Sequence, residues 1–165
     1  MLGRLTDGQC KALLRRATIG RIGVTAEGRT YVVPITFVFD GGYVYGHSSL
    51  GQKVRMMRAN HEVGFETDEI VDMANWKCVI ARGRYEELAG DLATAAARLI
   101  QSRLAPLTTS QTAGPSGPRA RGRRGDVAYR IALSDITGRY ERQTPTRMSG
   151  RRRLRPSASR RTVDA

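Results

Sequence analysis

The sequence predicts a mainly β fold of the α+β class, in which a mostly antiparallel barrel has short helices plugging its openings. Two observations support this prediction: the expected strands are short, and tight hairpin turns join several of them. A third is the order of the elements, which runs helix, three strands, helix, two strands, helix, strand. An open α+β sheet fits the same order and remains the alternative.

The chain is expected to begin with a helix that is followed by a short strand. Thr6 and Gln9 resemble a capping box, and apolar residues follow them at helical spacing. A short amphipathic helix is therefore predicted at residues 7–17. Alternating apolar residues then predict a strand at 21–26, which a Glu-Gly turn separates from the next run.

The stretch from residue 29 to residue 46 is predicted to form a hairpin. A β-branched and aromatic run indicates a long strand at 29–39, and Asp-Gly-Gly supplies residues that tolerate a positive φ in the turn after it. The return strand is expected at 43–46. Pro34 cannot donate to a ladder, so it marks a sheet edge, a bulge or a place where a ligand replaces a neighbouring strand.

The middle of the chain is expected to alternate between helix and strand. Apolar spacing predicts a short helix at 51–59, and alternation predicts a strand at 62–67. An acidic loop should follow, before a long strand at 76–88. A helix at 90–104 is then expected to stop before Pro106.

The last third of the chain is predicted to contain one more strand between two irregular segments. Residues 107–125 are rich in Ser, Thr, Gly, Pro and Arg and are typical of a flexible insertion loop. Residues 126–133 alternate like a strand that returns to the sheet, and residues up to 142 close the domain. Residues 143–165 contain almost nothing apolar and are predicted to be a disordered basic tail.

Composition favours a soluble protein of the cytoplasm. No apolar run approaches the roughly 20 residues that a membrane-spanning helix needs, and arginines interrupt the apolar runs near the N-terminus. Cys10 and Cys78 are widely separated and lack CxxC spacing, so they are expected to be reduced thiols. The net charge is +13, and residues 110–165 carry 14 Lys/Arg against 4 Asp/Glu.

This basic C-terminal third raises a function of another class, which is nucleic-acid binding through phosphate contacts. The tail has no helix-turn-helix or RNA-binding signature, and Tyr140 is the only aromatic residue near it that could stack on a base. A solvated tail is therefore favoured over a nucleic-acid-binding one.

The polar corner after the hairpin is the main candidate site. Residues 48–53 read SSLGQK and precede the expected helix at 51–59. Unpaired N–H groups at a helix N-terminus, two hydroxyls and the Lys53 ammonium would together form a phosphate cradle. On spacing alone, the phosphate cradle is slightly less favoured than a simpler alternative, in which Ser49 caps the helix and Lys53 is solvated. The pattern is not a Walker motif.

Two further residues carry open alternatives. His47 precedes the corner and is either a hydrogen-bonded structural residue, a phosphate donor, a contact to a bound ring or a haem ligand. Trp76 either packs in the core or stacks on a planar ligand. The nearby carboxylates at residues 66–72 lack the spacing of a calcium loop, so no metal site is predicted.

Taken together, five segments resemble the pyridoxamine 5′-phosphate oxidase-like split-barrel flavoproteins. They read GRIGV, GRTYVVPITFVFDGGYVYGHSSLGQK, RANHEVGFETDE, WKCVIARGRYEEL and YRIALSDITGRYE, and they cover about residues 5–142. The branch most similar is the nitroimidazole-resistance type, which has a similar YVVP strand, H-S corner and G-x-K helix start. The oxidase itself is a poorer match, since its substrate-binding regions have no evident counterpart.

The resemblance implies a six-stranded antiparallel split barrel and a homodimer with a flavin mononucleotide (FMN) at each end of the interface. The residues that it places against the isoalloxazine ring are Val32, Val33, Pro34, Ile35 and Thr36. The residues that it places around the phosphate are His47, Ser48, Gln52 and Lys53. It also implies that Trp76 lines the same pocket, from the same chain or from its partner.

The function expected from the resemblance is an FMN-dependent oxidoreductase. It would reduce a small electrophile, such as a nitro compound or a quinone, by hydride transfer at flavin N5. The family also contains haem binders and users of a deazaflavin coenzyme. A haem, with His47 as its ligand, and a deazaflavin coenzyme are therefore the alternative cofactors.

Overall fold

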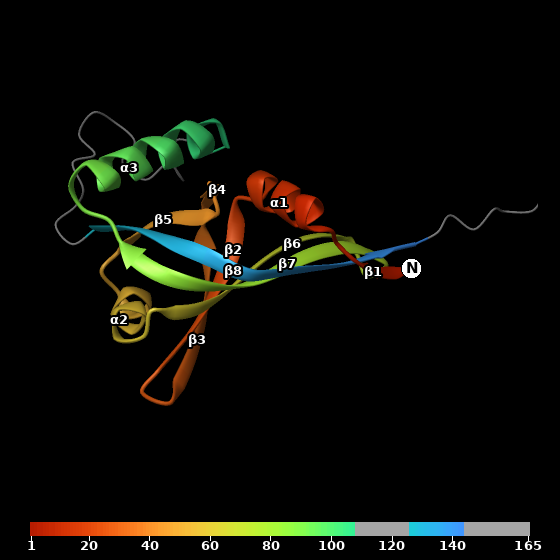
Figure 1. Cartoon of the computed structure of the whole chain (residues 1–165), viewed down its shortest axis with the longest axis horizontal. Coiled ribbons are helices and arrows are strands. Elements are labelled where there is room, and N and C mark those ends of the chain that lie inside the picture. Colours follow the sequence, from red (N-terminus) through yellow and green to blue (C-terminus); the bar gives the residue numbers. More distant parts are fainter. Residues whose placement is uncertain (108–125, 144–165) are drawn as a thin grey trace, which may run out of the picture.

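The computed structural model describes residues 1–107 and 126–143 as one antiparallel sheet with three α-helices packed around it (Figure 1). The sheet has eight strands, ordered β3-β2-β6-β7-β8-β5-β4, with β1 paired to β8. The strands are β1 (Leu2–Arg4), β2 (Ile19–Ala26), β3 (Arg29–Thr36), β4 (Val38–Asp40), β5 (Tyr43–Ser49), β6 (Glu62–Asp72), β7 (Asn75–Glu87) and β8 (Asp126–Arg142). The helices are α1 (Asp7–Arg16), α2 (Gln52–Ala59) and α3 (Gly90–Leu104).

The chain connection at Phe37 makes this sheet curl into a barrel. β3 and β4 lie at opposite ends of the strand order, yet a single residue joins them. The sheet can satisfy both conditions only by bending until its two ends meet. Phe37 is fully buried at this closure, where its ring packs edge-on against Phe65 and its N–H donates to the carbonyl of Thr18 at 2.9 Å. The barrel class predicted from the sequence is therefore confirmed.

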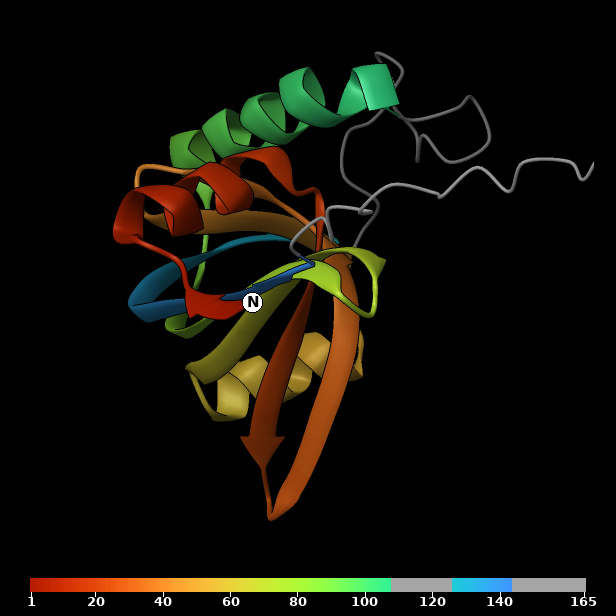
Figure 2. The same ribbon diagram turned by 90° about the vertical axis from the view of Figure 1, so that its right-hand side faces the viewer.

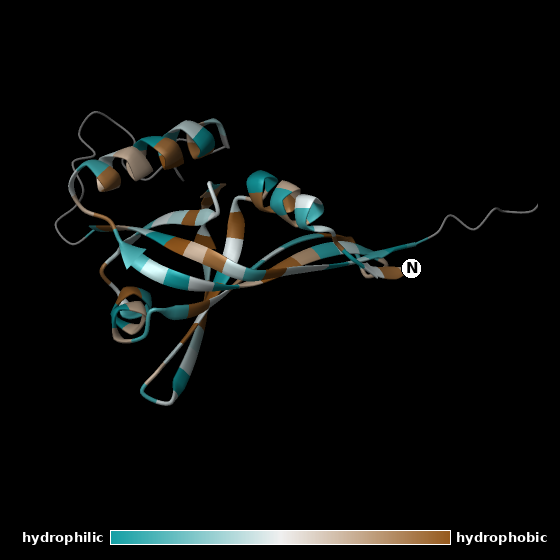
Figure 3. Ribbon diagram, in the orientation of Figure 1, coloured by the Kyte–Doolittle hydropathy of each residue, from teal (hydrophilic) through white to brown (hydrophobic). Residues whose placement is uncertain are grey.

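The core is formed by inward-facing side chains of the strands and by one face each of α1 and α2. Alternation of apolar and polar residues is visible along the strands in Figure 3. The largest side chains that are fully buried belong to Tyr129, Phe37, Phe65, Leu14, Ile22, Met57 and Ile131.

The helices cover different sides of the barrel (Figures 1 and 2). α1 begins with the predicted capping box, because the Thr6 hydroxyl accepts from the Gln9 N–H and the Gln9 side chain accepts from the Thr6 N–H. α1 and α3 lie on one side of the sheet, and α2 lies on the other, beside the β2–β3 hairpin. α2 inserts Val54 and Met57 into the core.

Most predicted strands are longer than the sequence pattern indicated. The strand expected at 29–39 is divided by Phe37 into β3 and β4, and β1 was not predicted, so eight strands replace the expected six. The predicted acidic loop after residue 67 is wrong, because β6 continues to Asp72 and pairs with β7. β8 also continues to Arg142, after a bulge at which Asp135 has a φ of 47°.

Two predicted segments lie outside the described residues, namely the insertion loop at 107–125, apart from Leu107, and the basic tail at 143–165, apart from Gln143. Leu107 ends a short 3₁₀ turn, Ala105–Leu107, that contains Pro106 and follows α3 directly, as expected for a proline at a helix end. Within the described part of the chain, no helix is long and apolar enough to cross a membrane.

Candidate functional site

At the corner between β5 and α2, the backbone N–H groups at the start of the helix are not capped by a side chain. The N-cap of α2 is Gly51, which makes no side-chain cap hydrogen bond, and the first turn contains no acidic residue. Ser49 does not cap this helix; its hydroxyl donates to the Asp126 carboxylate at 3.1 Å. The plain alternative, in which Ser49 caps the helix, is therefore wrong. The N–H groups of the first turn remain available to an anion.

Lys53 places a cation at this same helix end. Its side chain is half-buried, and this burial lowers the pKa of its ammonium group. Within the described residues, Lys53 makes no ion pair or side-chain hydrogen bond. Two effects disfavour this arrangement: an unpaired charge is partly removed from water, and a cation lies at the positive end of the helix dipole. Such a group is stabilised when an anion binds beside it.

The β2–β3 hairpin brings a free sheet edge to the same region. Glu27 and Gly28 form its two-residue turn with φ angles of 51° and 70°, as a type I′ turn requires. The pair that flanks such a turn, Ala26 and Arg29, exchanges both hydrogen bonds, and hydrogen-bonded and non-hydrogen-bonded pairs then alternate.

By this alternation, Val32 and Pro34 occupy non-hydrogen-bonded pairs, opposite Gly23 and Arg21. Their backbone groups therefore point away from β2, and β3 has no strand on that side within the described residues. Pro34 thus lies where its missing N–H costs no ladder bond, which confirms the sheet edge as one of its predicted roles. The Val32 side chain is 63% exposed, so this edge also presents apolar surface.

The other predicted ring contacts have different environments. Val33 is half-buried, Ile35 is buried and Thr36 is exposed. β3 and β5 contact each other across the barrel closure. The structure therefore places the predicted ring strand beside β5, the strand that carries His47 and Ser48 of the predicted phosphate corner.

His47 and Ser48 lie near the C-terminal end of β5, because this strand continues to Ser49, whereas the return strand was predicted to end at residue 46. His47 Nε2 is 3.6 Å from an Asp126 carboxylate oxygen, and its side chain is 49% exposed. The Ser48 hydroxyl donates to the Ser49 carbonyl at 3.1 Å. Asp126 thus ties both His47 and Ser49 to β8, which fixes the corner against the sheet.

Trp76 does not join this cluster within one chain. It pairs with Ile70 and Glu141 at the far end of the β6–β7 ribbon, and its indole N–H donates to the Glu141 carboxylate at 3.2 Å. α2 precedes the opposite end of that ribbon, where Glu62 pairs with Arg84. Figure 1 shows α2 and the N-terminal end of the molecule on opposite sides.

A groove of about 370 Å³ runs between α2 and the β2–β3 hairpin, and we call it the hairpin groove. Its walls are Ala26, Glu27, Arg29, Thr30 and Tyr31 of the hairpin and Gln52, Arg55, Met56 and Ala59 of α2. Sequence reasoning identified only Gln52 among the helical residues. The signal that it missed is the spacing of residues 52, 55, 56 and 59, which places all four on one helix face.

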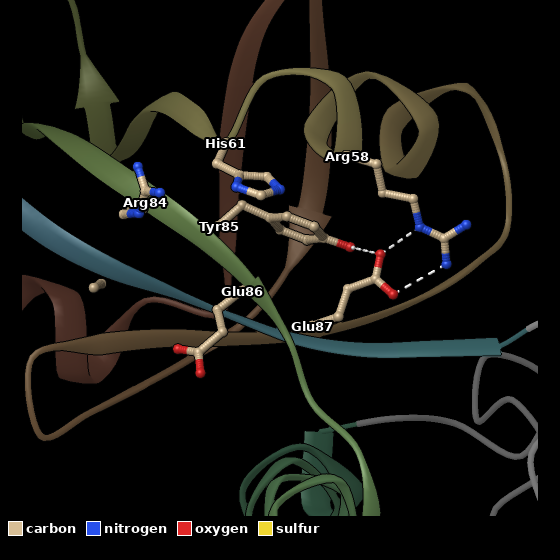
Figure 4. Close-up of a pocket in the computed structure, with 7 residues that line it drawn as sticks. Arg58, His61, Arg84, Tyr85, Glu86 and Glu87 are labelled. Carbon is tan, nitrogen blue, oxygen red and sulfur yellow. Dashed lines mark hydrogen bonds and ion pairs between the residues drawn. The ribbon is translucent and has the colours of Figure 1, made fainter.

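A second pocket, of about 550 Å³, lies on the other flank of α2 (Figure 4). Its centre is a satisfied network: Arg58 donates twice to the Glu87 carboxylate, at 2.5 and 3.0 Å, and the Tyr85 hydroxyl donates to the same group at 2.9 Å. The His61 ring lies 6.1 Å from the Tyr85 ring. This network anchors α2 to β7, so we assign it a structural role.

Comparison with known proteins places this arrangement in a family. The model of the family described as pyridoxamine 5′-phosphate oxidase matches residues 6–140. An uncharacterised protein of Rhizobium meliloti is 32% identical over 80 residues. That match covers 48% of this chain and 53% of the relative, so it spans about half of each protein.

Solved structures of similar proteins match a larger part of this chain than the Rhizobium meliloti protein does. A FAD-binding protein from Mesorhizobium loti is 27% identical, with a TM-score of 0.71, over 85% of this chain and 98% of its own. The FAD binding protein from Mycobacterium smegmatis is 26% identical, with a TM-score of 0.62, over 86% and 100%. A candidate 5-nitroimidazole antibiotic resistance protein from Bacteroides thetaiotaomicron shares the fold at 19% identity, with a TM-score of 0.64, over 85% and 87%.

These matches agree with the fold described above and with the resemblance seen in the sequence. The family model spans most of the chain, from the capping box of α1 to the end of β8. This chain therefore belongs to the pyridoxamine 5′-phosphate oxidase family.

Proposed function

We propose that this chain is a flavin-dependent oxidoreductase that reduces a small electrophile, such as a nitro compound or a quinone. The observation that carries the proposal is Lys53, a half-buried cation without a partner among the described residues, at the uncapped end of α2. A phosphate ester would supply the anion that this corner lacks. β3 lies across the hairpin groove from α2, and its open edge offers backbone groups to a planar ring.

Each part of the site has a distinct role in this proposal. Lys53 and the first-turn N–H groups of α2 neutralise the phosphate, with the Gln52 amide as a further donor. The Ser48 hydroxyl would become another donor by turning away from the Ser49 carbonyl, to which it donates in this structure. The edge of β3 from Val32 to Thr36 holds the isoalloxazine, with apolar contact from Val32 and hydrogen bonds from outward backbone groups. When bound, the flavin supplies hydride transfer at N5. The protein would hold and orient the ring.

Two of the compared proteins support a flavin as the cofactor. The structures from Mesorhizobium loti and Mycobacterium smegmatis, both above 25% identity, are described as FAD-binding proteins. FMN is the cofactor that the sequence resemblance favours, and it contains every group that Lys53 and β3 would contact. The proposal therefore specifies the FMN portion of the flavin.

We also propose that the protein is a homodimer. Ile19, Val32 and Ile80 are 54–63% exposed, and the strand register places them on the same outer face of the sheet. Ile70 and Met73, at the β6–β7 tip near Trp76, are 67% and 95% exposed. Apolar exposure of this kind is typical of an interaction surface. A partner chain that covers this face would bring its own Trp76 toward a neighbouring site.

The absorption spectrum of the purified chain, before and after addition of FMN, tests the function. Flavin absorption bands that remain with the protein through gel filtration support the proposal, and sedimentation of the same sample measures the dimer. A Soret band instead would favour haem and a role for His47 as its ligand. Selective retention of a deazaflavin coenzyme would favour that alternative. Retention of no flavin would refute the proposed function.

A further inference from the structure

The pairing of β5 with β8 brings a carboxylate to the phosphate corner. Ser49 lies directly opposite Asp126, and His47 lies opposite Ala128. Directly opposite residues of an antiparallel pair project from the same face of the sheet, and residues two apart on one strand share that face. The side chains of His47, Ser49 and Asp126 therefore meet on one face, at the end of β5 from which the chain turns into α2.

Asp126 uses both of its carboxylate oxygens at this place. Oδ1 accepts a hydrogen bond from the Ser49 hydroxyl at 3.1 Å, and Oδ2 lies 3.6 Å from Nε2 of His47. The Asp126 side chain is only 14% exposed. A carboxylate with so little access to water is stabilised by nearby donors and by positive charge. The Ser49 hydroxyl supplies a neutral donor, and His47 can supply a positive charge.

The position of Asp126 determines which nitrogen of the His47 ring is left for a ligand. Nε2 faces the carboxylate, and the two ring nitrogens can bind different partners. The His47 side chain is half exposed and makes no other ion pair or side-chain hydrogen bond within the described residues. Nδ1 is therefore the nitrogen that remains available to a ligand.

A phosphate at this corner would give the His47 ring a second anionic neighbour. A ring with a carboxylate near one nitrogen and a phosphate at the other is favoured in its protonated form, which is a donor at both nitrogens. The same proton offsets the charge of Asp126, which would otherwise repel the phosphate. Asp126 and His47 thus suit an anionic ligand when they act as a pair.

We propose that Asp126 is a positioning residue of the phosphate site, which holds the His47 ring by Nε2 so that its Nδ1–H donates to the phosphate of the flavin. This inference rests on the proposed function, from which it takes the flavin and the place of its phosphate. His47 joins Lys53 and Gln52 as a group that binds the phosphate. Asp126 acts through His47 and does not touch the ligand.

The test is a double-mutant cycle on the affinity of the flavin-free full chain for FMN, measured by fluorescence titration. Asp126→Asn keeps an oxygen that can accept from Ser49 and removes the charge. It should weaken FMN binding about 5-fold, the difference between a charge-assisted and a neutral hydrogen bond. His47→Gln should weaken it at least as much, and the double variant should match His47→Gln, because Asp126 acts through the ring. Riboflavin, which has no phosphate, should bind all three variants as it binds wild type.

Asp135→Asn is the matched control, since Asp135 is an exposed carboxylate of the same strand and lies outside the corner. It should bind FMN as wild type does. A second readout is the nitrogen-15 spectrum of the His47 ring with FMN bound, near neutral pH. Wild type should show N–H groups at both ring nitrogens, and Asp126→Asn should show only one. Ser49→Ala, which removes a structural bond and keeps the charge of Asp126, should give the wild-type spectrum.

Four results would overturn the inference: an unchanged FMN affinity in Asp126→Asn, additive effects of the two substitutions, equal losses of FMN and riboflavin affinity, or a single N–H on His47 in the wild-type complex. A spectrum that changes equally in Ser49→Ala and Asp126→Asn would also overturn it, because the role of Asp126 would then be structural. In all of these cases wild type still binds flavin, so the proposed function stands. Failure of wild type to bind any flavin would instead refute the proposed function itself.

Discussion

Replacement of Lys53 by methionine is expected to weaken phosphate binding and to stabilise the ligand-free protein. Met has a similar length and no charge, so the change removes the ammonium group and keeps its apolar contacts. A charge-assisted contact to phosphate contributes about 1.5–3 kcal/mol, so affinity for FMN should fall about 10- to 100-fold. Riboflavin, which has the same ring and no phosphate, should bind the variant as well as it binds wild type.

The gain in stability follows from the position of the charge. A cation at a helix N-terminus costs about 0.3–1 kcal/mol, and half-burial without a partner adds to this cost. Lys53→Met should therefore raise the free energy of unfolding by about 0.5–1 kcal/mol, measured by urea denaturation without flavin. Lys11→Met is the control, because Lys11 lies on α1, outside the proposed site, and is paired with Asp7.

The pH dependence gives the same reasoning a second measurement. Burial lowers the pKa of Lys53 in the folded state below its ordinary value of 10.5. At pH values between the folded-state pKa and 10.5, Lys53 binds more protons in the unfolded state than in the folded state. The free energy of unfolding of wild type should therefore rise with pH in this range. Below the folded-state pKa the cost is fully present. The variant should lack this rise. Equal losses of FMN and riboflavin affinity, or a less stable ligand-free variant, would refute the assignment of Lys53.

Three substitutions test the packing around the site by urea denaturation. Tyr129→Phe should raise the free energy of unfolding by about 1 kcal/mol, because the buried Tyr129 hydroxyl has no hydrogen-bond partner among the described residues; a loss of similar size would mean that the hydroxyl is satisfied. Gly46→Ala should lower the free energy of unfolding by about 1–3 kcal/mol, because a Cβ there would lie 2.4 Å from the Tyr129 ring. Gly64→Ala is the control and should be tolerated, because its Cβ would lie 3.8 Å from the nearest atom. Equal effects of the two substitutions would contradict this reasoning. Glu87→Gln should cost about 0.5–1 kcal/mol near neutral pH. The hydrogen bonds from Arg58 lower the pKa of Glu87, so this cost should disappear as the pH falls through the folded-state pKa; a cost that persists in acid would exclude the ion pair as its source.

Local chemistry made part of this structure readable from the sequence. The capping box of Thr6 and Gln9, the hairpin turns and the proline after α3 act over a few residues, and each appears where it was predicted. Pro34 could be assigned to an edge because it has no N–H to give. The family could be recognised because five such segments occur in a fixed order.

Tertiary structure decided the rest, because it depends on residues that are distant in sequence. Strand ends were wrong at β5, β6 and β8, where a neighbouring strand continues to offer hydrogen bonds to polar residues that alone resemble a loop. Ser49 resembled a cap until Asp126, on a strand far along the chain, proved to be its partner.

The candidate site divides in the same way. The sequence by itself determined that a histidine, hydroxyls, a glutamine and a lysine follow the hairpin, in an order that precedes a helix. It did not determine whether Lys53 is paired or solvated, because that depends on every carboxylate that the fold brings near. Only the closed barrel leaves Lys53 half-buried without a partner among the described residues, and only the packing of α2 against the hairpin forms the groove beside it.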